Sequence, residues 1–321
     1  MRPEHFHYLL EINRYHSISS AARALHMSQT TLSSIVKTAE DELGFPIFQR
    51  APNGVTVTAE GNRLMALAWE IDVKYEELLS LKNQENSPAQ PINVLLSPSV
   101  NVGLAIPLSK QFYQFELRGN LAFEEWPGLE VGPRIIQNAA NIGVAYLSAA
   151  ELEVFRKDAD RSKVNIEPLL QDKFYLIVSK KHWLTGREKI HLSEINDERL
   201  AIVTSFCSNT GDPLWRALAR SSSRTISYPN ISAMKQAVQT QGMIGILTGY
   251  AIHGDGGVDP AQFSAIPIEM DASPNRIWIY LIRRGDRSLR YQEKVLVSCI
   301  QEHFGACSRL AEFAADAQAH Q

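Results

Sequence analysis

A run of short polar side chains follows Ser28, and its chemistry suits contact with a polar polymer. The run combines hydroxyls with one amide and one cation: Gln29, Thr30, Thr31, Ser33, Ser34 and Lys37. Hydroxyls and amides donate and accept hydrogen bonds, as base edges require, and an ammonium group attracts phosphate. Acidic residues come only afterwards, at positions 40–42, where a helix lying on DNA would leave the phosphates. The set therefore indicates contact with DNA.

Two amphipathic helices are expected to position these side chains. Apolar residues recur at helical spacing in residues 18–25 and again in residues 32–43. The residues between them, 26–28, are long enough only for a turn, and Ser28 is a good N-cap. Two short helices joined in this way are the geometry of a helix-turn-helix, whose second helix enters the major groove. Periodicity alone fits an ordinary surface helix in a small bundle as well.

A β-hairpin is expected after the second helix. Residues 47–50 and 55–57 are β-prone and flank Pro52-Asn53-Gly54. Beside a helix-turn-helix this hairpin would be the wing of a winged helix. Arg50 and Asn53 are its candidate DNA contacts, and the alternative is that Arg50 caps or pairs within the domain.

Residues 6–61 resemble the N-terminal domain of the LysR-type transcriptional regulators. The matching residues occur in unbroken order: Phe6, Leu9, Ser17, Ala21, Ala22, Leu25, Ser28, Gln29, Leu32, Ser33, Glu40, Leu43, Gly44, Phe48, Arg50, Gly54, Thr58 and Gly61. The family usually has Pro-Ala where this chain has Thr30-Thr31, and often Arg then Gln where it has Ser34-Ile35. These departures bear on which bases are read, and not on the fold.

The resemblance implies that residues 1–58 form a winged helix-turn-helix that binds double-stranded DNA at a partly palindromic promoter site. The contacts would come from the second helix, its cap and the hairpin: Ser28, Gln29, Thr30, Thr31, Ser33, Ser34, Lys37, Arg50 and Asn53. RNA polymerase is a further candidate partner. Charge counts mildly against strong nonspecific binding by one subunit, because residues 1–61 hold five Lys or Arg and six acids, and the net charge of the chain is −3.

A long helix is expected over residues 59–87, with Thr58 as its N-cap. Leu64, Ile71 and Leu78 are seven residues apart and form a heptad-like apolar stripe. The resemblance implies that this helix joins two subunits into a homodimer, from which a homotetramer could assemble. The alternative is that the stripe packs against its own chain. Residues 88–91 are expected to be a hinge.

Strand-like and helical stretches alternate after residue 92, the pattern of an α/β domain. The strand-like runs are residues 92–96, 121–125, 142–146, 174–178, 200–203, 244–247 and 277–282. The resemblance extends here to the family's effector-binding domain, which is similar to periplasmic binding proteins. It implies a two-lobed domain over 92–310, with lobe 1 in 92–165 and 266–310, lobe 2 in 166–265, and a tail in 311–321. The fold class is thus a mostly α winged helix-turn-helix with a long linker helix, followed by a two-lobed α/β effector-binding domain.

Two hydroxyl-rich segments are expected at the cleft between the lobes. Residues 97–101 and 204–210 each follow a strand, and ligands of such domains bind outside the carboxyl ends of strands. Their hydroxyls suit a carboxylate or a polar ring substituent. With the resemblance, the expected pocket for a small-molecule effector contains Ser97, Ser99, Val100, Ala145, Thr204, Ser205 and Phe206. The alternative is that these segments are capping loops without a ligand.

Cys207 has a second interpretation, because peroxide-sensing members of the family carry a reactive cysteine in roughly this loop. A thiol near a helix N-terminus can have a lowered pKa. However, a reversible sensor usually has a resolving cysteine nearby, and Cys299 and Cys307 are expected in the other lobe. The alternative is that Cys207 is a small thiol in the pocket or the core. The three cysteines have no zinc-binding spacing, so neither a metal nor a cofactor is expected.

The remaining function classes are set aside on motifs. Signatures of hydrolases, zinc proteases and P-loop enzymes are absent, so no enzyme activity is expected. No signal peptide or membrane-spanning run is found, which leaves the cytoplasm as the expected compartment, without membrane association. The competing hypothesis is a ligand-binding or thiol-based redox-sensing protein whose near-neutral head has lost DNA binding.

Overall fold

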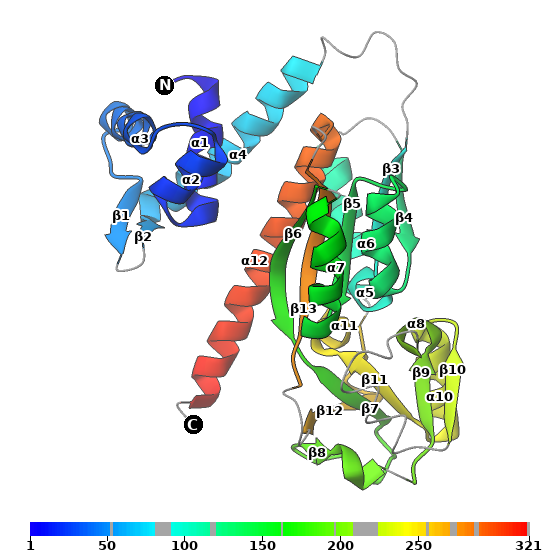
Figure 1. The fold of residues 1–321 in the computed structure, drawn as a ribbon. Coiled ribbons are helices and arrows are strands. Elements are labelled where there is room, and N and C mark those ends of the chain that lie inside the picture. Colours follow the sequence, from blue (N-terminus) through cyan, green and yellow to red (C-terminus); the bar gives the residue numbers. More distant parts are fainter. Residues whose placement is uncertain are drawn as a thin grey trace. The chain divides into compact units, whose positions relative to one another are not determined.

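The chain forms two units, residues Met1–Pro88 and Ala89–Gln321 (Figure 1). The computed structural model describes residues 1–51, 54–80, 91–115, 120–161, 163–195, 197–207, 224–254, 257–269, 275–285 and 289–319. The first unit is mainly helical, and the second combines two β-sheets with helices. This is the fold class that the sequence predicts.

Three helices and a hairpin precede one long helix in the first unit: α1 (Pro3–Tyr15), α2 (Ile18–Ala24), α3 (Gln29–Leu43), β1 (Phe48–Ala51), β2 (Gly54–Val57) and α4 (Ala59–Ser80). Ser17 caps α2 by accepting a hydrogen bond from the N–H of Ser20, and Ser28 caps α3 by accepting one from Thr31. Between the helices, His26 has a left-handed backbone with φ of 53°. The predicted helix-turn-helix is confirmed.

The apolar stripes of α2 and α3 face a common core with α1. Its fully or almost fully buried members are Leu9, Ile12, Ala21, Ala22, Leu32, Val36, Ala39 and Ile47. Burying a large aliphatic side chain contributes roughly 1.5–3 kcal/mol. The core therefore fixes which face of α3 points outward.

The hairpin is attached to the end of α1. Strands β1 and β2 pair antiparallel, with Phe48 opposite Val57 and Ala51 opposite Gly54. A side chain at Gly54 would clash with the carbonyl of His16, and the φ of Gly54 is 139°, so glycine is required there. The N–H of Val55 donates to that same carbonyl at 2.9 Å. The hairpin thus has a fixed place beside the helices.

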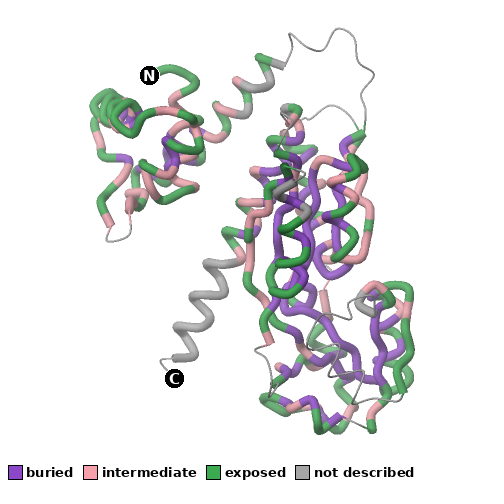
Figure 2. Tube along the Cα trace, in the orientation of Figure 1, coloured by how far each residue is buried: buried purple, intermediate pink, exposed green. Residues whose placement is uncertain are grey.

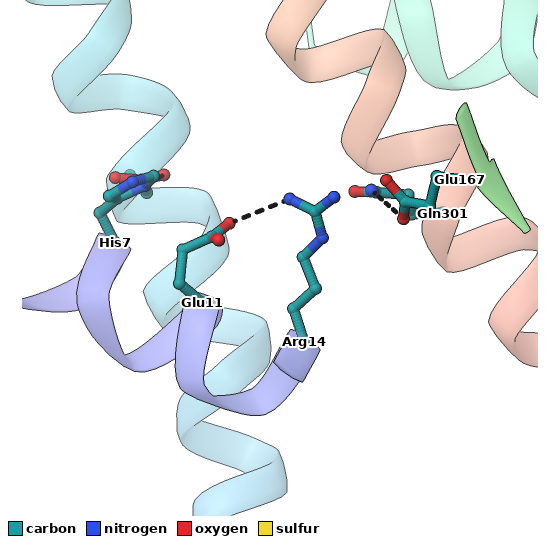
Figure 3. A network of polar contacts seen from close by, with 6 residues as sticks. His7, Glu11, Arg14, Glu167 and Gln301 are labelled. Atoms are coloured by element: carbon teal, nitrogen blue, oxygen red, sulfur yellow. Dashed lines mark hydrogen bonds and ion pairs between the residues drawn. The ribbon is translucent and has the colours of Figure 1, made fainter. Parts of the chain in front are cut away.

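The first sheet of the second unit has five strands in the order β4 (Leu121–Glu125), β3 (Ile92–Leu96), β5 (Ile142–Leu147), β13 (Ile277–Arg284) and β6 (Val164–Asp172). Strand β3 is parallel to its two neighbours, and β13 is antiparallel to its own. The helices of this lobe are α5 (Pro98–Gln114), α6 (Gly128–Ile136), α7 (Ala149–Arg161) and α12 (Tyr291–Ala319). Gln301 of α12 donates to Glu167 of β6 at 2.7 Å (Figure 3).

The second sheet has six strands in the order β10 (Thr225–Tyr228), β9 (Leu200–Val203), β11 (Ile244–Thr248), β7 (Phe174–Ser179), β12 (Phe263–Glu269) and β8 (Ile190–His191). Its helical elements are the 3₁₀ turn η2 (Leu192–Ile195), α8 (Thr204–Cys207), α10 (Ile231–Gln241) and α11 (Gly249–His253). Figure 2 shows that the central strands of both sheets are buried. Each lobe has its own apolar cluster.

The lobe boundaries in the structure differ from those expected at 165/166 and 265/266. Residues 166–172 belong to β6, which pairs with β13 from Val164 opposite Arg284 to Asp172 opposite Ile277. Residues 266–269 belong to β12 in the second sheet. The chain therefore crosses between the lobes after β6 and again after β12. Long-range strand pairing sets these crossings, and local composition does not reveal it.

Two further boundaries expected from the sequence agree only in part with the structure. Helix α4 begins directly after Thr58 as predicted and is described to Ser80. Residues 81–90, which include the rest of the predicted helix and most of the predicted hinge at 88–91, lie outside the described residues. At the other end α12 continues to Ala319, so most of the expected Ala-rich tail of 311–321 is helical.

None of the helices in the described part of the chain is both long and apolar enough to cross a membrane.

Candidate functional site

The outward face of α3 carries the predicted DNA-contacting side chains. Gln29, Thr30, Thr31, Ser34 and Lys37 are exposed. Ser33 is half-buried, while Leu32 and Val36 are buried in the core. The structure thus brings the predicted residues of α3 together on one polar surface.

Hydroxyl groups cluster at the first turn of α3. The Ser28 hydroxyl accepts from the N–H of Thr31 at 3.1 Å and lies 2.8 Å from the hydroxyl of Thr30 and 2.7 Å from that of Thr31. Ser28 therefore first serves as the helix cap. Partial positive charge at a helix N-terminus, together with these hydroxyls, suits a phosphate oxygen.

Two of the three acids at the end of α3 have internal partners that the sequence does not reveal. Oε1 of Glu40 accepts from the N–H groups of Ile47 and Phe48, at 2.7 and 3.1 Å. The N-terminal ammonium group of Met1 pairs with Glu42. Glu40 thus joins α3 to the first strand of the hairpin. The sequence gives only a weak sign of this role of Glu40: it is a carboxylate that precedes a strand whose N–H groups need acceptors.

Arg50 lies on β1 and is exposed, opposite Val55 of β2. The other predicted hairpin contact, Asn53, lies outside the described residues. The exposed Arg50 guanidinium is accessible to a phosphate or a minor groove.

The long helix α4 divides its apolar stripe between two environments. Leu64 and Met65 are buried in the first unit's core and Ala68 is buried too, whereas the exposed fractions of Leu67 and Leu78 are 57% and 62%. Ile71 and Leu79 are exposed too, at 39% and 47%. One part of the stripe therefore packs within its own chain, and the other part faces outward. The expected role of the helix in joining two subunits stays a prediction.

Polar contacts fix α4 along α1. The Tyr75 hydroxyl donates to Glu4 at 3.0 Å, and His7 lies 3.3 Å from Asp72. Within α1, Arg14 pairs with Glu11 at 3.4 Å (Figure 3). These contacts set which face of α4 remains outward.

A pocket that is partly open to solvent lies between the two lobes of the second unit. Its lining comes from the ends of strands and the starts of helices: Ser97, Pro98, Gly128, Leu129, Tyr146, Glu151, Phe174, Ser205, Thr248 and Ile277. This is the edge at which the sequence predicts a ligand. The pocket brings together Ser97 and Ser205, one from each hydroxyl-rich segment.

The other predicted pocket residues have different surroundings. Ala145 and Val100 are fully buried, Ala145 within the apolar cluster of the first lobe. Ser99 is also fully buried, and Thr204 is exposed and donates to the carbonyl of Tyr228 at 3.0 Å. The side chain of Phe206 lies outside the description.

Tyr146 lines the pocket in place of Ala145. Successive residues of a strand point to opposite faces of the sheet, so an error of one position in β5 changes the face. The Tyr146 hydroxyl donates to Asp172 at 2.6 Å. Burial, followed by the charge of Asp172 and this hydrogen bond, raises the pKa of Tyr146 well above its ordinary value of 10.0. The phenol therefore stays protonated and remains a donor to Asp172.

Comparison with known proteins assigns the chain to a family. Residues 3–62 match the family described as "Bacterial regulatory helix-turn-helix protein, lysR family", and residues 85–305 match the LysR substrate binding domain. The chain belongs to the LysR family of transcriptional regulators. Its first unit is the helix-turn-helix DNA-binding domain, and its second is the substrate-binding domain.

Two curated relatives of this LysR-family regulator are distant in sequence. The uncharacterized HTH-type transcriptional regulator YwqM of Bacillus subtilis (strain 168) is 23% identical over 244 residues, which cover 73% of this chain and 78% of YwqM. The match to YcgK of the same organism covers 55% of this chain and only 52% of YcgK, at 27% identity.

Solved full-length LysR-family structures have the same fold. A full-length OxyR variant from Pseudomonas aeruginosa is 20% identical with a TM-score of 0.50, and the match covers 94% of this chain and 99% of that one. Full-length BenM is 15% identical with a TM-score of 0.52, over 96% and 98% of the two chains.

The cysteines of the regulator lie in different lobes, as the sequence predicts. Cys299 and Cys307 are on α12 of the first lobe, whereas Cys207 ends α8 of the second. Burial raises the pKa of Cys299 to about 12 and also raises that of Cys307. Both are therefore poorly nucleophilic thiols. The side chain of Cys207 lies outside the described residues, so its redox role stays a prediction. Among the described residues no cluster of three or more His, Cys, Asp or Glu could hold a metal ion.

Asp172 connects the two lobes beside the pocket and was missed from the sequence. Its Oδ2 atom accepts from the Tyr146 hydroxyl of lobe 1 and from the N–H of Tyr250 of lobe 2, the latter at 2.9 Å. Tyr250 in turn lies 2.7 Å from Nε2 of His303 on α12. The end of β6 is thus a polar junction between lobes, and a single Asp within a strand pattern gives no signal of it.

Proposed function

We propose that this LysR-family regulator binds a partly palindromic promoter site as a homodimer and reads it with α3. The single observation that supports this assignment most is the outward polar face of α3, because its side chains are short donors and acceptors on a helix that follows a tight turn. Gln29, Thr30, Ser33 and Ser34 would contact base edges.

Phosphate contacts would come from the edges of this surface. Thr31 lies with the Ser28 hydroxyl at the N-terminus of α3, and Lys37 and Arg50 are exposed cations. Asn53 of the hairpin would join them. Such contacts fix the position of a protein on the duplex, and base contacts set its sequence preference. The few cations of one head make binding by two heads important for affinity.

The homodimer would form through the outward side chains of α4, Leu67, Ile71 and Leu78. Exposed large apolar side chains at heptad spacing favour a second helix as their partner. A two-fold dimer presents two recognition helices, which matches a partly palindromic site. A dimer of such dimers, giving a homotetramer, is part of the same proposal.

A small molecule in the interlobe pocket would control the regulator. It could shift the arrangement of the lobes only if it binds the two arrangements with different affinity. Asp172 is well placed to respond, because Tyr146 of the pocket and the N–H of Tyr250 share one of its oxygens. The output would be altered spacing of the heads at the promoter and altered contact with RNA polymerase, in the cytoplasm.

The Lys37→Ala variant tests the DNA-binding surface. It should weaken binding to all DNA sequences about equally and reduce the slope of log affinity against log salt by about 1. Titration of labelled promoter DNA at several salt concentrations measures both. Lys110→Ala, at an exposed lysine of α5 in the other unit, is the matched control. Equal salt slopes for Lys37→Ala and wild type would overturn the phosphate contact.

A further inference from the structure

Helix α4 lies against α1 in two successive parts that differ in chemistry. In the first part, Leu64 and Met65 are buried in the apolar core of the first unit together with Leu9 of α1. In the second part, which follows the buried Ala68, α4 contacts α1 through polar side chains. The apolar core therefore holds the start of α4, and polar contacts continue along the helix.

Two polar pairs make this second contact at an even spacing. Nδ1 of His7 lies 3.3 Å from Oδ2 of Asp72 (Figure 3), and the Tyr75 hydroxyl donates to Oε1 of Glu4 at 3.0 Å. The second pair is three residues further along α4 and three residues back along α1, so the two helices run antiparallel in one register. Residues three apart are neighbours on a helix surface. The four residues therefore form one polar seam.

The polar seam favours one position of α4 relative to α1. A hydrogen bond is made only over a narrow range of distance and angle, whereas apolar surfaces can slide against one another. A backbone hydrogen bond, followed by the one from Tyr75, lowers the pKa of Glu4, so the acceptor of this pair is a charged carboxylate. Pairs near the surface add little to overall stability. The seam is therefore expected to affect the direction of α4 more than the unfolding of the head.

The seam lies between two surfaces that serve the proposed function. The exposed residues Leu67, Ile71 and Leu78 form the neighbouring face of α4, through which two subunits would join. On the other side of the seam, Leu9 of α1 shares the apolar core with Leu32 of α3. The direction of α1 along α4 thus sets the direction of α3 relative to the face that would join the subunits.

We propose that the polar seam fixes the direction of each DNA-binding head on the α4 pair of the homodimer, and so sets the separation of the two DNA arms that the regulator accepts. The inference rests on the proposed function, because it needs a homodimer that reads two arms. Asp72 and Tyr75 are then positioning residues, since they lie on α4 and act through α1 and α3. Two linked modules bind two sites most strongly where the connection matches the span, and a looser connection accepts more spacings with less gain in affinity.

The test compares the binding of the full-length protein to DNA sites with different arm separations. The protected promoter site is prepared with its natural separation, with two extra base pairs between the arms, and with one arm only. Since about 10 base pairs make one helical turn, two extra base pairs rotate one arm by roughly a fifth of a turn. Titration above the Kd of the homodimer gives the affinity for each DNA. Wild type should prefer the natural separation by roughly tenfold or more.

The double variant Asp72→Ala and Tyr75→Phe removes both contacts and leaves the surface of α3 unchanged. Its preference for the natural separation should fall to about threefold or less, while its Kd for the single arm should stay within about twofold of wild type. Glu4→Ala should have the same effect as Tyr75→Phe alone, because each removes the same hydrogen bond. Glu70→Ala, at an exposed acid of α4, is the control and should keep the wild-type preference.

A merely structural role of the seam predicts another pattern. The double variant would then have a lower Tm and would bind all three DNAs more weakly by the same factor, with its preference for the natural separation unchanged. That pattern, or binding of all three DNAs as tight as that of wild type, would overturn the positioning role. Absence of sequence-specific protection by wild type would instead contradict the proposed function, and the inference would fail with it.

Discussion

At the scale of single residues, Glu40 shows how an acid near a DNA-binding surface can have a structural task. Its carboxylate accepts from the N–H groups of Ile47 and Phe48 and so fixes the hairpin relative to α3. From the sequence, this negative charge is expected to repel phosphate. In the structure, the carboxylate is instead a hydrogen-bond acceptor within the domain. Asp41, the neighbouring acid, is exposed.

Replacing Glu40 with Ala should loosen the start of β1. Two N–H groups lose their acceptor, which costs about 1–3 kcal/mol for each that stays buried. Hydrogen exchange of the Ile47 and Phe48 amides should therefore become at least tenfold faster. Mass spectrometry of the peptide that contains them measures this, with Asp41→Ala as control. Unchanged exchange in Glu40→Ala would show that these bonds do not hold the hairpin.

Glu293 should make the second unit sensitive to acid. Burial raises its pKa, but hydrogen bonds from Arg290 and Asn141 outweigh burial, so the pKa lies below the ordinary value of 4.5. A lowered pKa in the folded state stabilises the protein above pH 4.5, and this contribution is lost as the pH falls through the folded value.

The matching variant is Glu293→Gln, which has no charge to lose. The Tm of wild type should fall more steeply than that of Glu293→Gln as the pH is lowered below 4.5. Differential scanning calorimetry between pH 6 and about 3 measures both curves, and the magnitude should be modest because the partner of Glu293, Arg290, is partly exposed to solvent. Parallel curves for the two proteins would contradict the assignment.

At the scale of elements, α4 provides the clearest test of assembly. Leu67 and Leu78 are more than half exposed, in contrast to the buried Leu64 and Ala68 on the same helix. The double substitution Leu67→Glu and Leu78→Glu should weaken a dimer at least tenfold, because charges would replace apolar contacts. Sedimentation over a range of concentrations gives the Kd, with Glu70→Gln as control. A dimer as tight as wild type would show that another surface joins the subunits.

Some helices and strands could be predicted from the sequence, and others could not. The helix-turn-helix could be predicted because its caps, Ser17 and Ser28, and its stripes are local signals. Strand β6 was missed because its burial alternates irregularly and it contains Pro168, and β10 because it is largely exposed. Their place in the sheets depends on long-range pairing, which no local pattern encodes.

The candidate pocket could likewise be predicted only in part. Ser97 and Ser205 follow strand ends, so their position was expected from the α/β pattern. The sequence predicts Ala145 in the pocket, but Tyr146, the next residue of β5, lines it. Every residue of β5 is buried, so apolar residues occupy both faces of the strand and their alternation does not show which face a residue is on. Asp172 could not be found at all, because its partners come from both lobes.

In the molecule as a whole, DNA binding and effector binding are assigned to separate units. DNA contact is assigned to Met1–Pro88, and effector binding to Ala89–Gln321. Within the second unit, Asp172 links the two lobes, since it accepts hydrogen bonds from Tyr146 of one lobe and Tyr250 of the other. Under the proposed function, control of transcription would depend on how an occupied pocket alters the pairing of two such chains.

A footprint on the intergenic DNA upstream of the regulator's own gene tests whether α3 reads a specific site. At a fixed moderate salt concentration, the protein should protect a partly palindromic site, with two arms about one helical turn or a multiple of it apart. The spacing of the arms would also report the dimer. Binding that occurs only at low salt and without sequence preference, there and at other promoters, would contradict α3 as a reading helix.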